Sequence, residues 1–449
     1  MSNLDTARLA ATRAREDAGF RARTPKSEAM RLRAAAHLPN SVPMAWMAGL
    51  YRTPPIYCES GSGPRFRDID GNDYLDFNVA DLSMSAGFAP PPIVAAVSAQ
   101  IARGAHFLLP TPDAVEVAEC LSELVGLPFW QATLSATGAN TEVMRIARTA
   151  TGRERIVVFG GHYHGHLDEM LVTAADGLVK AEVAGLPRHA GAATRIVPFN
   201  NLPALEQELK SGDVALVLME PALSNCNIVL PDAGFLAGVR ELTARYGTLL
   251  CLDEAHTFQF AYGGLARAWS LQADFIVLGK GLGTGIPFGL YGMSAALGQL
   301  CARQLDIDVG PRGLGTGGTL YASAIALAAA RAALTHLLRP DDYARITSLG
   351  RRLADGLEQL FSKHRLPWRA FRLGPRSGYC LEPTLPRDGD EAARSINVDF
   401  IDTRRVYFAN RGIWDAVASA GPQVSLVHTA ADVDRYLEVA GEFLAEIAA

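Results

Sequence analysis

The chain has 449 residues, 49% hydrophobic and 20% charged, which is typical of a globular protein rather than a disordered one. A net charge of −5 and the lack of a basic stripe argue against a nucleic acid as partner. The six cysteines are too widely spaced for zinc or disulfide pairs, and no apolar stretch is long enough for a membrane span. Because no targeting segment is evident either, we expect a cytoplasmic protein.

The N-terminal part of the chain predicts mostly local elements. Residues 3–37 are rich in alanine and arginine and predict a polar helix, which a proline-rich passage over 39–55 ends. Residues 65–77 predict a hairpin, because two strand-like runs flank the turn Asp70-Gly71-Asn72. A helix is expected over 91–104, where the pattern opens on proline and closes on glycine.

From about residue 112, helical segments alternate with short apolar runs. The runs are rich in Val, Ile and Leu and show no polar alternation, which is typical of strands buried on both faces of a parallel sheet. They lie at residues 155–159, 215–220, 247–254 and 273–279. The sequence therefore predicts an α/β protein with three parts: an N-terminal segment 1–60, a large domain 61–335, and a smaller α+β domain 336–449.

Polar side chains follow three of the predicted strands in order. Glu220 and Asn225 follow the first, Asp253 and Glu254 the second, and Lys280 the third. Ligands of open α/β sheets gather at the carboxyl ends of strands, so these groups are expected to converge there. A lone lysine or acidic pair is usually a solvated loop residue, but burying such groups beside apolar strands is costly unless they are paired or functional.

This set suits a carbonyl cofactor with a pyridine ring. A lysine amine forms a Schiff base with such a cofactor, and a buried aspartate keeps the ring nitrogen protonated. The segments DEAHTFQF (253–260) and ADFIVLGKGLGTGIPFGLYG (273–292) resemble the signature of class III aminotransferases. The resemblance is to the branch that contains glutamate-1-semialdehyde aminomutase, and it extends from about residue 39 to the C-terminus. It implies the fold type I of pyridoxal-phosphate transferases, with pyridoxal 5'-phosphate as cofactor.

The resemblance implies roles for individual residues. Lys280 matches the Schiff-base lysine and Asp253 the partner of the pyridine nitrogen. Ala255 takes the place of a valine that covers one face of the cofactor, and Asn225 matches an asparagine at the ring hydroxyl. Tyr163, in GGHYHGHLDE, matches a tyrosine that stacks on the ring.

The segment LSATGANTEV resembles the family's phosphate-binding turn. Gly138 allows close backbone approach, and the following helix offers free N–H groups to an anion. Ala139 replaces a threonine, so we expect Thr137 or Asn140 to compensate for the missing hydroxyl. Thr319 matches a threonine that reaches the phosphate of a neighbouring subunit, which implies a homodimer with shared active sites; the alternative is that Thr319 caps the following helix.

Two alternatives concern other residues of the site. The alternating His162, His164 and His166 also fit a metal site, although no carboxylate or cysteine completes one. The aminomutase pattern has an arginine for the substrate carboxylate where Met47 stands here. Trp46 and Met47 therefore suggest an apolar substrate wall or ordinary core packing, and Arg52 is a candidate for binding a substrate carboxylate.

The residues named above are common to enzymes that catalyse several different reactions, so they do not by themselves identify the reaction. We expect an aminotransferase that moves an amino group from an amino donor to a 2-oxo acid acceptor. The alternatives on the same scaffold are a glutamate-1-semialdehyde-type 2,1-aminomutase, an amino-acid racemase or epimerase, and a cofactor-binding protein that has lost catalysis.

Overall fold

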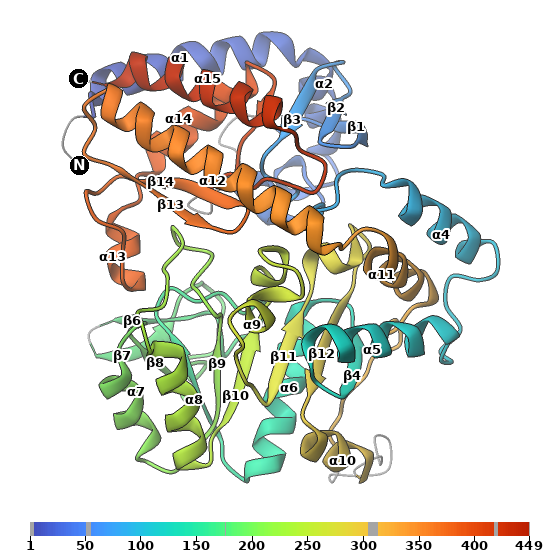
Figure 1. The fold of residues 1–449 in the computed structure, drawn as a ribbon. Helices are drawn as coiled ribbons and strands as arrows, with labels where there is room; N and C mark the ends of the chain where they lie inside the picture. Colours follow the sequence, from blue (N-terminus) through green and yellow to red (C-terminus); the bar gives the residue numbers. More distant parts are fainter. Residues whose placement is uncertain (1–3, 51–54, 176, 304–312, 417–420, 449) are drawn as a thin grey trace. The chain divides into compact units, whose positions relative to one another are not determined.

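The computed structural model describes residues 4–50, 55–175, 177–303, 313–416 and 421–448. The chain folds into two compact units (Figure 1). Unit 1 consists of Met1–Pro90, Asp341–Leu385 and Arg394–Ala449, and unit 2 of Pro91–Pro340 and Pro386–Ala393. Residues 61–90 thus belong to unit 1, in contrast to the expectation that they are part of the large domain.

Unit 2 is built on a seven-stranded sheet. Its order is β4 (Phe129–Thr133), β12 (Gly289–Met293), β11 (Phe275–Leu278), β10 (Leu249–Asp253), β9 (Val214–Met219), β5 (Arg155–Phe159) and β8 (Thr194–Val197). β12 pairs antiparallel with β4 and β11, and all other neighbouring strands are parallel. The mostly parallel sheet is therefore confirmed, and the four predicted apolar runs form β5, β9, β10 and β11.

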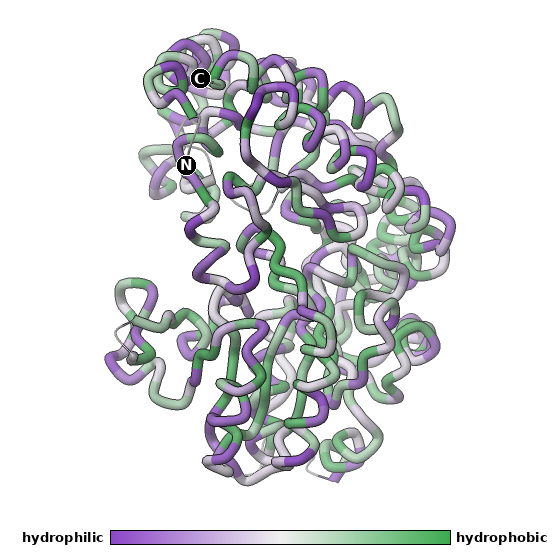
Figure 2. Tube along the Cα trace, turned by 60° about the vertical axis from the view of Figure 1, so that its left-hand side comes forward, coloured by the Kyte–Doolittle hydropathy of each residue, from purple (hydrophilic) through white to green (hydrophobic). Residues whose placement is uncertain are grey.

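Helices cover both faces of this sheet because each strand alternates its side chains between two apolar faces. Leu218 and Cys251 pack in one core with Val143 and Ile146 of α6 (Ala136–Thr151). Met219 and its neighbours on the other face lie against α8 (Phe235–Tyr246). Figure 2 shows the central strands of unit 2 as hydrophobic segments, as expected for strands buried on both faces.

The remaining elements of unit 2 surround this core. α11 (Ala324–His336) packs against α4 (Pro91–Ile101) and α5 (Pro112–Val125). The other elements are α7 (Leu202–Leu209), α9 (Gly264–Ala268), α10 (Ala295–Arg303), α13 (Gly389–Arg394), the hairpin of β6 (Val172–Ala175) and β7 (Leu178–Ala181), and two short 3-10 helices, η2 (Thr257–Gln259) and η3 (Lys280–Gly283).

Unit 1 is held together by pairing between distant parts of the chain. Its sheet has the order β1 (Cys58–Ser62), β2 (Arg65–Asp68), β3 (Asp73–Asp76) and β15 (Ile413–Trp414), and β13 (Arg369–Leu373) pairs with β14 (Arg376–Cys380). Because β15 comes from the C-terminal segment and pairs with β3, the predicted hairpin 65–77 joins unit 1.

The helices of unit 1 are also drawn from both ends of the chain. They are α1 (Thr6–Arg23), α2 (Pro25–Ala34), η1 (Pro39–Ser41), α3 (Ala45–Leu50), α12 (Pro340–Lys363), α14 (Val398–Ala409) and α15 (Ala430–Ile447). The predicted N-terminal helix is thus divided at Pro25, which takes the first position of α2. α1 packs against α14 and α15. In the part of the chain that the structure describes, no helix is both long and apolar enough to cross a membrane.

Candidate active site

The first turn of α6 forms one wall of the candidate site. Ser135 caps the helix, since its hydroxyl oxygen accepts a hydrogen bond from the N–H of Gly138 at 3.4 Å. Residues 137–140, expected to form a turn, are therefore already helical. A helix start carries N–H groups without intrahelical partners and favours a bound anion.

Glycines allow the neighbouring segments to pack closely on this helix start. A Cβ at Gly289, the first residue of β12, would lie 2.3 Å from the Ser135 carbonyl carbon. A Cβ at Gly165, which has φ of +94°, would lie 2.1 Å from Thr137 Oγ1. The loop that contains Tyr163 therefore packs directly on α6, and the His166 N–H donates to Thr137 Oγ1 at 3.3 Å.

Asp253 lies at the end of β10 as a buried carboxylate with three hydrogen-bond donors. His164 Nδ1 and Asn140 Nδ2 each lie 2.8 Å from Asp253 Oδ2, and the Ala255 N–H donates to Oδ1 at 3.0 Å. All three side chains are at most 3% exposed. Burial by itself raises the pKa of Asp253, but the hydrogen bonds from His164 and Asn140 hold it below its ordinary value. Asp253 is therefore an anion, and His164 donates from Nδ1.

Lys280 follows β11 directly. Its side chain is half-buried and its φ of +47° is in the left-handed region, which is costly for a residue with a Cβ and recurs at functional sites. A Cβ at the preceding Gly279 would lie 3.2 Å from the Cβ of Ala136. The lysine turn is thus seated against the start of α6, and β11 pairs in parallel with β10, which ends at Asp253.

Glu220 is a second buried carboxyl group at the strand ends. β9 and β10 pair in the register Met219 with Leu252, so Glu220 follows β9 where Asp253 ends β10. Its Oε2 accepts from the N–H and the hydroxyl of Ser224, while Oε1 is buried without a hydrogen-bond partner. Burial raises the pKa of Glu220 to about 7, although the nearby His164 and Ser224 partly oppose this shift.

The turn before α11 also packs on α6. The Gly317 N–H donates to Glu142 at 2.5 Å, and a Cβ at Gly138 would lie 2.9 Å from the hydroxyl of Tyr321. Thr319 lies in this turn and is exposed. The alternative role as helix cap is not observed, because Ser323 caps α11.

The other predicted site residues have different surroundings. Tyr163 is 40% exposed, Asn225 is exposed and Ala255 is half-buried, so their side chains reach the surface of unit 2. Ala139 instead lies on the buried face of α6 and packs in the core, and its N–H donates to the Ser135 carbonyl oxygen. The expectation that Asn140 compensates at the phosphate turn is corrected, because its amide group is fully buried and holds Asp253.

The substrate-binding residues predicted near the N-terminus belong to unit 1. Trp46 and Met47 lie in the short helix α3 and are 49% and 42% exposed, so they are not core residues. Met47 lines a cavity of unit 1, whereas Trp46 does not line it. Arg52 lies outside the described residues.

The metal alternative for the three histidines finds no support in their contacts. The ring nitrogens of His162 lie 2.9 Å from the Phe159 carbonyl oxygen and 3.1 Å from that of Met170, and His164 bonds to Asp253. Within the described ranges no group of three potential ligands has a geometry for a metal ion.

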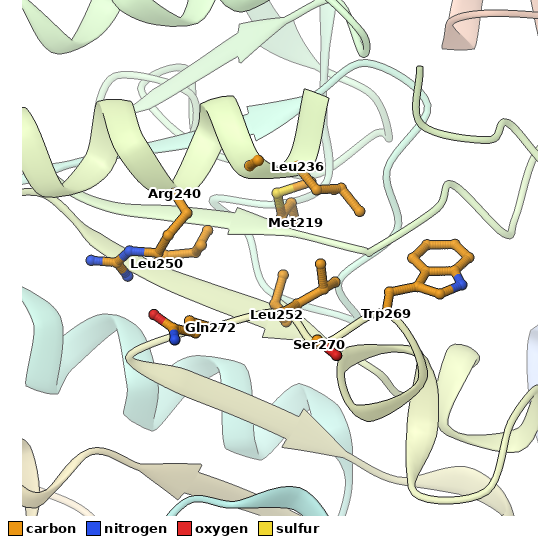
Figure 3. Close-up of a pocket in the computed structure, with 10 residues that line it drawn as sticks. Met219, Leu236, Arg240, Leu250, Leu252, Trp269, Ser270 and Gln272 are labelled. Carbon is orange, nitrogen blue, oxygen red and sulfur yellow. The ribbon is translucent and has the colours of Figure 1, made fainter. Parts of the chain in front are cut away.

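A separate small cavity lies on the α8 face of the sheet. It has a volume of about 300 Å³ and is lined by Leu236 and Arg240 of α8, by Met219 and Leu252 of the strands, and by Trp269 (Figure 3). Its lining includes none of the strand-end residues Glu220, Asp253 and Lys280. It is therefore distinct from the candidate site.

Two contacts of the site were not predicted from the sequence. The pairing of His164 with Asp253 joins residues 89 positions apart, and Ser224 links Glu220 to His256. His164 was noted only as one of three alternating histidines, and no spacing rule connects it to a strand end. The sequence offers only an indirect signal: a buried aspartate needs a hydrogen-bond donor, and a histidine can supply one.

Comparison with known proteins gives extensive matches. The model of the family described as aminotransferase class-III matches residues 47–369. Glutamate-1-semialdehyde 2,1-aminomutase of Chloroflexus aggregans is 34% identical over 407 residues, which are 88% of this chain and 91% of the relative.

Solved structures match over nearly the whole chain. A variant glutamate-1-semialdehyde aminomutase of Pseudomonas aeruginosa, in complex with PMP, has a TM-score of 0.94 and 34% identity, covering 99% of this chain and all of that chain. An omega-transaminase of Sphaerobacter thermophilus has a TM-score of 0.84 and 27% identity, covering 94% of this chain and 97% of that chain.

The raised pKa of Glu220 predicts a pH-dependent cost in stability. In the unfolded chain this carboxyl ionises near pH 4.3, whereas in the folded protein it keeps its proton to about pH 7. Wild-type stability relative to Glu220→Gln should therefore be greatest below pH 4.3 and fall as the pH rises to about 7. Between pH 5 and pH 8 we expect the free energy of unfolding to shift in favour of the variant by about 1–3 kcal/mol, measured by urea denaturation.

The matched control is Glu119→Gln, which changes an exposed carboxylate on α5. Its difference from wild type should be constant between pH 5 and pH 8. A difference that is also constant for Glu220→Gln would show that Glu220 is ionised in the folded protein.

Proposed function

The chain belongs to the class-III aminotransferase family, and from this premise we propose that it is a pyridoxal-phosphate enzyme that moves an amino group from an amine-bearing substrate to a 2-oxo acid. The resemblance drawn from the motifs is confirmed, as is the fold type I of this family. The observation that carries the proposal is the meeting of a buried anionic Asp253 and Lys280 at neighbouring strand ends, against the start of α6.

The residues present fit this cofactor. The first turn of α6 supplies N–H groups for the phosphate, with Thr137 and Gly138 at the surface of the turn. Asp253 is already held as an anion by its own hydrogen bonds, so it is suited to a cationic ring nitrogen. Tyr163 and Asn225, whose side chains reach the surface, would contact the ring face and the ring hydroxyl.

Each residue then has a specific task. When bound, pyridoxal phosphate supplies a ring that takes up the electron pair left at the substrate Cα after its proton is removed. Asp253 holds a proton at the ring nitrogen, and His164 and Asn140 fix the orientation of the carboxylate. Ala255, beyond the end of β10, is small enough to leave room beside the ring.

Lys280 has two tasks in the proposed reaction. Its Nζ would hold the cofactor covalently. The same amine, when free, would accept the substrate Cα proton and later return it, which is general acid–base catalysis. Lys280 is half-buried and directly follows β11, so its side chain lies near the strand ends.

The choice of aminotransferase rests on Met47. The aminomutase pattern has an arginine for the substrate carboxylate there, and Met47 offers no cation. The names of the curated relatives favour the alternative, a glutamate-1-semialdehyde-type aminomutase, more directly than they favour a transaminase. The omega-transaminase, at 27% identity, supports the aminotransferase less strongly. We therefore keep the aminomutase as the second candidate.

A homodimer with shared sites is the second part of the proposal. Large apolar side chains are exposed on unit 2 around α4, the segment after it and the turn before α11, and such patches mark interfaces. They are Val94, Ile101, Phe107, Leu108, Leu109 and Leu320. Leu320 is adjacent to Thr319, and a hydrogen bond from Ile325 to Ala105 joins the two segments. A second copy that covers this patch would bring Thr319 to a neighbouring subunit.

The reaction is tested by its need for an acceptor. The holoenzyme should convert an amino donor only when pyruvate or 2-oxoglutarate is present, with one alanine or glutamate formed per donor consumed, as measured by chromatography. Lys280→Ala should lose about 10³-fold or more in rate, because both covalent attachment and proton transfer are removed.

The second candidate, an aminomutase, predicts different products and no need for an acceptor. An aminomutase would isomerise glutamate-1-semialdehyde by itself, and added 2-oxo acid would form no new amino acid. Rapid isomerisation without acceptor, together with no transfer from any donor, would reject the aminotransferase. Wild-type rates in Lys280→Ala would reject both candidates.

Mixed dimers test the role of Thr319. In dimers of Lys280→Ala and Thr319→Ala subunits, a shared site predicts one site with both lesions and one intact site. Activity per mixed dimer should then reach about half that of wild type, above the mean of the two parents. The assay needs limiting cofactor, because a single hydrogen bond to phosphate contributes about 1.5–3 kcal/mol.

A Thr319 that acts within its own subunit predicts a different activity for the mixed dimers. If Thr319 serves the site of its own subunit, where its turn packs on α6, mixed dimers have one dead site and one weakened site. Their activity would equal the mean of the two parents. An enzyme that is fully active as a monomer in analytical ultracentrifugation would likewise reject the shared site.

A further inference from the structure

Ser224 lies between two titratable side chains of unit 2. Its hydroxyl group forms hydrogen bonds with Glu220 Oε2 and, at 2.7 Å, with Nδ1 of His256, which directly precedes η2. Ser224 is fully buried, and Glu220 and His256 are 4% and 6% exposed. A serine beside a histidine ring is also the arrangement of a nucleophile, but a fully buried hydroxyl cannot meet a substrate. The contact therefore has to be explained by what it does within the protein.

The Ser224 hydroxyl has one hydrogen for these two partners. If it donates to His256 Nδ1, Glu220 donates to the Ser224 oxygen and is a neutral carboxylic acid. If it donates to Glu220 Oε2 instead, the carboxyl group is free to be an anion and His256 donates from Nδ1. A single O–H bond thus couples the charge of Glu220 to the position of the hydrogen on the His256 ring.

The surroundings of Glu220 favour the neutral acid. Its Oε1 is buried and has no hydrogen-bond partner among the described residues, so a carboxylate oxygen there would lack a donor. For the same reason the acid proton belongs on Oε2, where Ser224 accepts it. Burial, followed by the like charge of Asp253 at the end of the neighbouring strand β10, raises the pKa of Glu220 to about 7, although His164 and Ser224 oppose this shift.

The other titratable groups that face Glu220 add no second anion. In the part of the chain that the structure describes, they are His164 of the 163–166 loop, the Asp253 carboxylate and the thiol of Cys226. His164 donates from Nδ1 to Asp253, and its Nε2 has no described acceptor, which disfavours a second proton on this ring. Burial raises the pKa of Cys226 to about 12, so the thiol is neutral. Asp253 is therefore the one anion of this group while Glu220 keeps its proton.

We propose that Glu220, Ser224 and His256 form a proton-holding unit, in which ionisation of Glu220 moves the ring hydrogen of His256 from Nε2 to Nδ1. In this step the Oε2–H bond of Glu220 breaks, one proton leaves to solvent, and the Ser224 hydroxyl turns to donate to Oε2. On the His256 ring one N–H bond breaks at Nε2 and one forms at Nδ1. The unit thus loses one proton in total, and a second negative charge arises beside Asp253.

The unit is placed to act on the proposed reaction through this charge. Glu220 and Asp253 end neighbouring strands, and Asn225 directly follows Ser224, so the unit shares its segments with the proposed cofactor site. The assignment of Glu220 and His256 as positioning residues of that site rests on the proposed function. The coupling between these two residues does not.

Nuclear magnetic resonance of the full chain, with and without pyridoxal phosphate, tests the coupling. In protein labelled with ¹⁵N-histidine, the ring signals of His256, assigned with His256→Gln, show which nitrogen carries hydrogen. His256 should carry it on Nε2 at about pH 6 and on Nδ1 at about pH 8. The carboxyl carbon of Glu220, labelled with ¹³C and assigned with Glu220→Gln, should change with the same midpoint near pH 7, because coupled groups titrate together.

Two variants break the coupling in different ways. Glu220→Gln cannot ionise, and Ser224→Ala lacks the connecting hydroxyl, so in neither variant should the ring hydrogen of His256 follow the pH between about 6 and 8. In Ser224→Ala the carboxyl group of Glu220 still titrates. The matched control is Ser362→Ala, which removes an exposed hydroxyl on α12 and should switch as wild type does.

The outcomes separate the coupling from the proposed function. A ring hydrogen that stays on one nitrogen of His256 in the wild-type chain overturns the proposal. A switch at a pH at which the Glu220 signal is constant, or one that persists in Ser224→Ala, overturns it as well. If the coupled switch is found and lost in both variants, but the chain binds no pyridoxal phosphate, the unit is supported and the proposed function fails.

Discussion

The hydrogen bonds from His164 and Asn140 to Asp253 are the interaction on which the candidate site depends. A carboxylate fully buried at a strand end would otherwise take up a proton, and these donors lower its pKa instead. They also tie three separate segments, β10, α6 and the 163–166 loop, to one point. The position of this carboxylate and its charge are therefore set by hydrogen bonds within the protein.

This constraint explains why the surrounding backbone is rich in glycine. α6 must approach β12 and the lysine turn closely for Asn140 to reach Asp253, and Gly289 and Gly279 allow that approach. Gly165 has a positive φ and no side chain, which allows the 163–166 loop to pass directly over Thr137. The same packing leaves the first turn of α6 beside Lys280. The N–H groups of the α6 start, the Lys280 amine and the fixed Asp253 carboxylate are therefore brought together by the same close packing.

The sequence predicted the parts of the site that depend on local patterns. The buried strands and the residues that end them, Asp253 and Lys280, follow from apolar runs and their order in a parallel sheet. The partner of Asp253 could not be predicted, because Asn140 and His164 are distant in sequence and Asn140 looked like a turn residue. Residues 61–90 were misplaced for a similar reason, since the strand β15 that fixes the hairpin comes from the other end of the chain.

Attachment of the cofactor is the most direct test of the central claim. The chain has five lysines, Lys26, Lys180, Lys210, Lys280 and Lys363. Protein saturated with pyridoxal phosphate would be reduced with borohydride, digested and mapped by mass spectrometry. The account predicts one modified lysine per chain, at Lys280, and loss of the modification in Lys280→Ala. Stoichiometric modification of any other lysine, or none at Lys280, would contradict it.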